Sequence, residues 1–301
     1  MIDFIKGYIP SEQVESTRGC DLQTIDINDG DLKGNPFGRV GNMKLSHQKI
    51  GLFISGSIHS YFNDSLLGSG LGNSDDFDFI QIIQCLDVLI EETGVDWNKA
   101  KLTQLEFGFN LTTRMPADEI IQSLKFYDKR AASSFYNNKR RCSKFFELKN
   151  YYVLKVYNKG KHKKLNDNIL RIEVRMYPKK LKELKLNSIN ALRQEESYHR
   201  MFAFLMQCIE KLVFVDKTIG VSGISSEEKT LLQPGISADY WSELRHMYSR
   251  TTVKRQFDKF QNIITKYNLD TSQVLVKKAL KDKFKLLLDK SNKFLLYNNS
   301  K

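Results

Sequence analysis

A tyrosine, two carboxylates and a lysine are spaced so that neighbouring strands could bring them onto one surface. Tyr157 lies in the run YYVLKVYN, Glu106 in KLTQLEFGFNL and Glu173 in ILRIEVRM, and in each run apolar residues alternate with other residues. A strand turns alternate side chains to opposite faces, so all three residues are expected on the face opposite a buried apolar one. Such a surface offers more reactive groups than a hydrophobic core needs.

The chemistry that suits these groups is attack on a phosphodiester. A tyrosine phenol titrates near a pKa of about 10, so it is a weak nucleophile at neutral pH. It becomes useful when a cation supports the phenolate and the target is a phosphodiester with a good leaving group. Lys159, two residues after Tyr157, could reach a phosphate oxygen or lower the pKa of the phenol. The pattern favours a centre that nicks and rejoins DNA.

Carboxylates on adjacent strands could also hold a divalent cation. Glu106 and Glu173 would supply hard oxygen ligands, which suit Mg²⁺ or Mn²⁺, and the ion would polarise the scissile phosphate. His59 is a weaker candidate ligand, because a lone strand histidine is more often a hydrogen-bonding surface group. Asn110 could bind the ion, orient a neighbour or simply end its strand.

Each of these residues also has a purely structural explanation. Tyr157 could be a rim tyrosine with a half-buried ring, and Glu106 could be a surface carboxylate. Glu173 lies between Arg171 and Arg175 and could join cross-strand ion pairs with them. Taken one at a time, the structural explanations are favoured. The joint placement on one face keeps the catalytic interpretation open beside them.

The pattern of apolar residues predicts which elements position these groups. Strands are expected where apolar residues alternate, at 1–10, 48–62, 101–111, 151–157 and 169–176. Helices are expected where they recur at helical spacing, at 77–93, 117–127, 188–213, 226–249, 252–267 and 271–290. Gly94 is expected to end the first helix and Pro116 to open the second.

This order of elements predicts an α+β fold. A central, largely antiparallel sheet would carry helices on one face, and an all-helical region would follow it. We place the catalytic domain at 1–185 and the helical C-terminal region at 186–301. Residues 128–150 are expected to form a basic hairpin or arm.

Charge is distributed unevenly along the chain. The formal net charge is +12, but residues 1–120 hold 9 basic against 18 acidic residues, and residues 121–185 hold 19 against 5. An acidic centre flanked by basic segments suggests a polyanion guided to a metal site, although lysines also simply solvate helices and loops. The four cysteines have no CxxC spacing, so neither a zinc site nor a disulfide framework is expected. With no signal peptide or long apolar run, we expect a cytoplasmic protein.

Several segments together resemble the rolling-circle replication initiators of filamentous phages and related plasmid replication proteins. An opening MID is followed by GSIHSYFN at 56–63, LTQLEFGFN at 102–110 and LKVYNKGKH at 154–162. ILRIEVRM and a KKLKEL stretch then complete the order by residue 184. The resemblance covers roughly residues 1–185. It departs from the family at LEFGFN, where related sequences often carry an aspartate-bearing strand.

The resemblance implies roles for single residues. Tyr157 corresponds to the tyrosine nucleophile of the YxK element and Lys159 to its lysine, while Glu106 and Glu173 resemble the metal-binding carboxylates. The implied activity is a metal-dependent single-strand endonuclease and strand transferase that uses a 5′-phosphotyrosyl intermediate. The basic residues expected to hold DNA phosphates are Lys139, Arg140, Arg141, Lys155, Lys161, Lys163, Lys164 and Arg175.

The implied partners are single-stranded DNA, the double-stranded origin, and a host polymerase and helicase. The helical region at 186–301 would bind the origin duplex or a partner protein. Two alternatives remain open on the residues alone. One is a non-catalytic DNA-binding accessory or repressor, which would need the cations and aromatic residues but not the carboxylates. The other is a mobilisation relaxase, which shares the chemistry but acts at a transfer origin.

Overall fold

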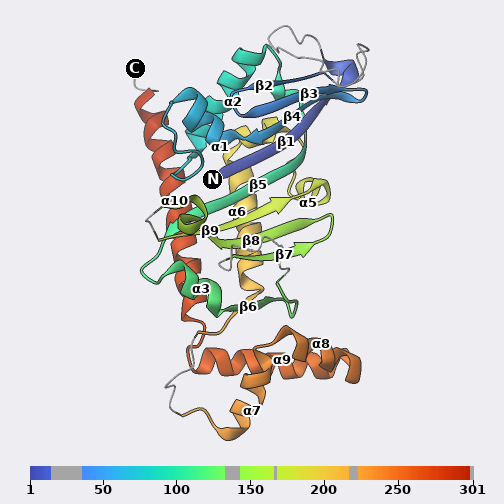
Figure 1. Ribbon diagram of the computed structural model, residues 1–301, viewed down its shortest axis with the longest axis vertical. Helices are drawn as coiled ribbons and strands as arrows, with labels where there is room; N and C mark the ends of the chain where they lie inside the picture. The colour runs from blue at the N-terminus through green and yellow to red at the C-terminus, as the bar shows by residue number, and fades with distance from the viewer. Residues whose placement is uncertain (15–35, 133–142, 166–167, 217–222, 299–301) are drawn as a thin grey trace.

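An eight-stranded antiparallel sheet forms the centre of the protein (Figure 1). The computed structural model describes residues 1–14, 36–132, 143–165, 168–216 and 223–298. The strand order is β2-β3-β4-β1-β5-β9-β8-β7, and each neighbouring pair is antiparallel. The strands are β1 (Ile2–Pro10), β2 (Phe37–Val40), β3 (Met43–Gln48), β4 (Gly51–Ser57), β5 (Lys101–Thr112), β7 (Ser143–Leu148), β8 (Tyr152–Asn158) and β9 (Ile169–Met176). The predicted α+β class is confirmed.

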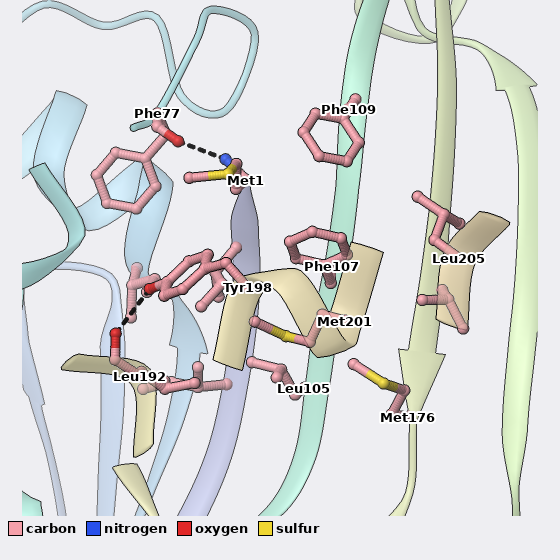
Figure 2. Close-up of a cluster of buried hydrophobic side chains, with 14 of the residues drawn as sticks. Met1, Phe77, Leu105, Phe107, Phe109, Met176, Leu192, Tyr198, Met201 and Leu205 are labelled. Atoms are coloured by element: carbon pink, nitrogen blue, oxygen red, sulfur yellow. Dashed lines mark hydrogen bonds between the residues drawn. The ribbon is translucent and has the colours of Figure 1, made fainter. Parts of the chain in front are cut away.

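Helices cover the apolar face of this sheet. α2 (Phe79–Thr93), α6 (Glu195–Glu210) and α10 (Thr271–Asn298) share one buried core with the strands. Figure 2 shows Phe107 and Phe109 of β5 packed near Met201 and Leu205 of α6. Burial of an aromatic or aliphatic side chain is worth about 1.5–3 kcal/mol, so these alternating positions fix which face of each strand turns inward. The polar side chains of the same strands are left on the opposite face.

The first long helix begins and ends as its sequence indicates. Asp78 and Gln81 form a reciprocal capping box at the start of α2, and Gly94 ends it with φ of 64° in the left-handed region. Short helical segments connect the longer elements: η1 (Ser11–Gln13), η3 (Trp97–Lys99), α4 (Lys159–Lys163), α5 (Pro178–Glu183) and η4 (Ile189–Arg193).

Several predicted boundaries are wrong, two of them in the first half of the chain. The strand expected at 48–62 ends at Ser57, because the Ser57 hydroxyl accepts a hydrogen bond from the Ser60 amide and caps α1 (Ile58–Ser60). A π-helical turn, η2 (Tyr61–Leu66), follows. The helix expected at 117–127 ends earlier: α3 covers Ala117–Ser123, and the next four residues form β6 (Leu124–Tyr127). β6 pairs with β10 (Leu212–Phe214), a partner far along the chain that local periodicity does not reveal.

The C-terminal helices belong to two packing units. α6 and α10 pack on the sheet, whereas α7 (Ser226–Gly235), α8 (Ala238–Met247) and α9 (Arg250–Lys266) share a second core with β6. This three-helix lobe lies at one end of the long axis, below β6 in Figure 1. The expected helical character of this region is confirmed, but two of its expected helices are divided. In place of one helix at 188–213, the chain forms η4 and α6 and then the strand β10. The helix expected at 226–249 is two helices, α7 and α8, separated by residues 236–237. No helix in the described part of the chain is both long and apolar enough to cross a membrane.

Candidate functional site

Strand register brings the predicted site residues onto one polar face. Across β5, β9 and β8, Gly108 pairs with Glu173, and Glu173 pairs with Lys155. One row further, Arg171 of β9 pairs with Tyr157 of β8. Neighbouring positions of one face lie about 5 Å apart across antiparallel strands, so these side chains are within reach of each other.

A glycine makes room for the central carboxylate. A Cβ atom at position 108 would lie 2.4 Å from the Glu173 Cβ and 2.4 Å from the Ile172 carbonyl oxygen. Any side chain there would push β5 and β9 apart or displace Glu173. Gly108 therefore allows the close approach of these two strands.

Three buried carboxylates meet on this face. Asp3, Glu106 and Glu173 each offer an oxygen, and these oxygens all lie within 4.8 Å of one another. The three residues are only 5%, 6% and 2% exposed. Sequence reasoning named Glu106 and Glu173 but missed Asp3. The signal that could have identified Asp3 is a lone carboxylate within the apolar run MIDFI.

Asp3 is held from three directions. It accepts hydrogen bonds from the Ser57 hydroxyl at 2.5 Å and the Asn73 side-chain amide at 2.5 Å. Arg171 Nη2 lies 3.1 Å from its second oxygen. Although burial alone would raise its pKa, Arg171 and the Ser57 hydrogen bond hold the pKa of Asp3 below its usual value. Asp3 is therefore ionised at neutral pH.

Three cations balance the three carboxylates. Lys155 Nζ lies 2.9 Å from Glu106 Oε1 and 2.8 Å from Glu173 Oε1, and so bridges them. Arg171 Nε lies 2.6 Å from Glu173 Oε2. Arg175 Nε lies 2.5 Å from Glu106 Oε1. Burial would raise the pKa of Glu173, but the charges of Arg171 and Lys155 lower it to about 2.

The carboxylate cluster has the donor chemistry for a divalent cation. Three hard oxygens within 4.8 Å of one another could bind a metal ion such as Mg²⁺ or Mn²⁺. The ammonium group of Lys155 already contacts two of the three carboxylates. An ion that used Glu106 and Glu173 together would have to displace this ammonium group.

Tyr157 and Lys159 lie where β8 ends and α4 begins. The Asn158 side chain caps α4 by accepting a hydrogen bond from the Lys161 amide at 2.9 Å. The Tyr157 ring lies 5.7 Å from the His162 ring, centroid to centroid. Burial, and next the charge of Glu173, raise the pKa of Tyr157 above its usual value. The phenol is therefore protonated at neutral pH.

Lys159 is buried, with 1% of its surface exposed. Its ammonium group donates to the backbone carbonyl of Asn73. Burial, and next the positive charge of Arg171, lower the pKa of Lys159 to about 7. A lysine that exchanges its proton near neutrality can accept a proton as well as donate one.

His59 and Asn110 lie beside the cluster and have other contacts. His59 Nε2 lies 2.7 Å from Asp75 Oδ1, and its ring stacks on Phe77 with 4.6 Å between centroids. Burial lowers the pKa of His59. Asn110 donates to the backbone carbonyls of Ser74 and Asp75 at 3.0 and 3.1 Å, and its side-chain oxygen accepts from Arg171 Nη1 at 2.9 Å. His59 is not one of the three carboxylate-cluster residues.

The residues expected to hold DNA fall into three groups. Lys139, Arg140 and Arg141 lie outside the described residues. Lys155 and Arg175 contact the carboxylates, as given above. The remaining three are exposed on or just after α4, where Lys161 also pairs with Asp118: Lys161, Lys163 and Lys164.

Comparisons with known proteins give little beyond this geometry. No protein-family model matches the chain, and no curated protein matches it significantly. Among solved structures, the chain is similar to a rolling circle replication initiator protein from Geobacillus stearothermophilus. That similarity has a TM-score of 0.37 and 9% sequence identity, and covers 74% of this chain and 89% of the other. Similarity this low establishes neither family nor function, so the functional conclusion depends on the residues of the site.

Proposed function

We propose that this protein is a rolling-circle replication initiator that nicks one DNA strand with Tyr157 and later rejoins it. The observation that carries the proposal is the row in which Tyr157 adjoins Arg171, on the face that holds the buried carboxylates Asp3, Glu106 and Glu173. A non-catalytic DNA-binding surface has no need for a buried acidic cluster beside a tyrosine. The sequence segments that resemble such initiators carry these same residues.

The proposed reaction exchanges one phosphodiester bond for another. The Tyr157 phenol oxygen bonds to the scissile phosphorus, and the bond from that phosphorus to the 3′ oxygen breaks. The phenol proton moves to the Lys159 amine, whose pKa of about 7 suits a proton acceptor at neutral pH. The leaving 3′ oxygen takes a proton from solvent and becomes a free 3′-OH. The reverse transfer rejoins the strand.

The acidic cluster would hold the divalent ion of this reaction. Asp3, Glu106 and Glu173 are the residues proposed to bind it, and the ion would supply polarisation of the scissile phosphate. Arg171 is paired in register with Tyr157, and its contacts with Asp3 and Glu173 would hold these two carboxylates in place beside the tyrosine. Lys161, Lys163 and Lys164 are exposed at the same end of β8 and can hold adjacent phosphates.

The resulting products define the partners that we propose. The free 3′-OH is a primer end for a host polymerase, and the displaced strand requires a helicase. Both would act on DNA in the cytoplasm of the host cell. The origin itself would be held partly as a duplex and partly as single strands.

A cleavage assay tests the proposal. Short single-stranded oligonucleotides that tile the non-coding DNA of the encoding element are incubated with the protein and Mn²⁺ or Mg²⁺. We expect a shortened product with a 3′-OH and a protein-linked 5′ fragment, both abolished by EDTA. Tyr157→Phe should abolish both products. Tyr8→Phe, which changes a partly exposed tyrosine of β1 on the same sheet, should leave them unchanged.

One observation favours a second candidate, a DNA-binding protein without cleavage. Lys155, Arg171 and Arg175 already pair with the three carboxylates, as a purely structural ion-pair network would. DNA binding that is unaffected by EDTA and by Glu173→Ala, with no covalent product from any oligonucleotide, would favour this candidate over the nickase.

A further inference from the structure

The three-helix lobe of α7, α8 and α9 carries its positive charge on one helix. α9 contains five basic residues and one acidic residue, Asp258. α7 and α8 each contain more acidic than basic residues. The excess positive charge of the lobe is therefore concentrated along α9 rather than spread over its surface.

The packing of the lobe turns this charge toward solvent. Val253, Phe257 and Phe260 lie on the buried side of α9, in the second core. The basic residues occupy the other positions and are exposed: Arg250, Lys254, Arg255, Lys259 and Lys266. Lys266 pairs with Glu228 of α7, at 2.8 Å. Among the described residues, no hydrogen bond or ion pair engages the side chains of Arg250, Lys254, Arg255 or Lys259.

α9 is also held rigidly. Trp241 Nε1 donates to the Gly235 carbonyl at 2.8 Å, and the Trp241 ring lies 4.9 Å from Phe257 and 5.4 Å from Phe260. A Cβ atom at Gly235 would lie 2.6 Å from the Phe260 ring, so α7 and α9 approach closely at this glycine. Held this way, the exposed face of α9 presents its cations in a fixed arrangement.

The turn that leads into α9 adds two exposed side chains to this face. Met247 is 64% exposed and Tyr248 is 54% exposed, although both are residues that proteins commonly bury. Arg245 precedes them and Arg250 follows them. The N-terminus of α9, capped by Ser249, contributes further positive potential at this point. The Arg245 guanidinium donates to the backbone carbonyls of Trp241 and Lys129, at 3.1 and 3.3 Å, so the available cations are those of α9 itself. Together with the helix N-terminus and the exposed tyrosine, they form a surface suited to a regular polyanion.

We infer that the exposed face of α9 binds the phosphate backbone of double-stranded DNA. A helix of 17 residues is about 25 Å long, and the major groove of a DNA duplex is wide enough to admit an α-helix. A flexible single strand of DNA offers no such fixed groove. The lobe lies beyond the β7 edge of the sheet in Figure 1, and β8, which carries Tyr157, is next to that edge strand. This inference rests on the proposed function: α9 would hold the duplex beside the nicking centre.

The test is a DNA-binding titration with the full chain and a random-sequence 30-base-pair duplex, followed by fluorescence anisotropy at several salt concentrations. The variant Lys254→Gln/Arg255→Gln/Lys259→Gln removes three charges from α9. A matched control, Lys278→Gln/Lys281→Gln/Lys285→Gln, removes three charges from the exposed side of α10. Each lost phosphate contact lowers the slope of log affinity against log salt by about 0.9, so the α9 variant should lower it by about 2 to 3.

The expected result is that the α9 variant loses duplex affinity and salt dependence while the α10 variant keeps both. Equal losses in the two variants would show a general effect of net charge and overturn the inference. Unchanged binding by the α9 variant would overturn it as well. Cleavage of a short single-stranded oligonucleotide should survive in the α9 variant. Failure of the nickase proposal, by contrast, would appear as no covalent product in any form of the protein.

Discussion

Lys155 is the residue whose replacement would report most on the carboxylate cluster. Its ammonium group contacts Glu106 at 2.9 Å and Glu173 at 2.8 Å, so it competes directly with any ion for those oxygens. Two unit charges about 4 Å apart interact by about 4 kcal/mol at an effective dielectric constant of 20. Lys155→Met keeps most of the apolar stem and removes this repulsion toward an incoming cation. Even a third of that interaction energy corresponds to a change of about tenfold in metal affinity.

We therefore expect Lys155→Met to bind Mn²⁺ at least about tenfold more tightly than the unaltered protein, as measured by isothermal titration calorimetry. Without metal, the variant should be less stable by about 1–3 kcal/mol, because two buried carboxylates lose a partner. Added Mn²⁺ should restore its melting temperature. Lys6→Met removes a charge from an exposed position on β1 and should change neither property. Equal or weaker Mn²⁺ binding by Lys155→Met would refute the idea that this ammonium group occupies a metal position.

Three further predictions concern the same face. Gly108→Ala should lower the free energy of unfolding by about 1–3 kcal/mol in urea denaturation, because its Cβ has no space beside Glu173. Asp3→Asn should weaken Mn²⁺ binding by at least about tenfold in calorimetry, whereas His59→Gln should leave it unchanged; the reverse pattern would place the ion at His59. The cleavage rate should rise with pH through about 7, because the Lys159 amine is protonated below that pH and neutral above it. Lys159→Met should remove this rise and slow cleavage by about a hundredfold or more.

The pKa of Lys159 also has a consequence for stability. Its folded-state value of about 7 lies below the ordinary value of 10.5, so the unfolded chain binds the proton more tightly between these two pH values. Burial of the charged amine therefore costs stability below pH 7, and this cost is relieved as the pH rises from 7 toward 10.5. Relative to Lys159→Met, the unaltered protein should gain stability across that range in denaturation experiments at several pH values.

The sequence predicts the polar face of the sheet well because the period of a strand is two. Once Tyr157, Glu106 and Glu173 are each placed on a strand, the burial of the alternate apolar residues fixes the direction of each side chain. The helix ended by Gly94 was equally predictable, since its capping residues act within a few positions of one another. Local chemistry and local periodicity are sufficient for features of this kind.

Features that depend on distant partners could not be predicted in this way. Asp3 joins the cluster only because β1 lies beside β5, a neighbour almost a hundred residues away. β6 forms because β10 pairs with it, although the sequence at 124–127 continues a helical pattern. The bridging contact of Lys155 depends on the register of three strands at once. Each of these three features depends on which distant strands pair with each other, and local sequence patterns do not reveal that pairing.

The central claim is that Tyr157 becomes covalently attached to DNA, and mass spectrometry of the trapped adduct tests it most directly. Trypsin digestion should release a short peptide that spans Val156 to Lys159, since lysines stand at 155 and 159. After reaction with a cleavable oligonucleotide and nuclease trimming, this peptide should carry a 5′-linked nucleotide on Tyr157. An adduct mapped to any other residue, or cleavage without a protein–DNA bond, would contradict the account.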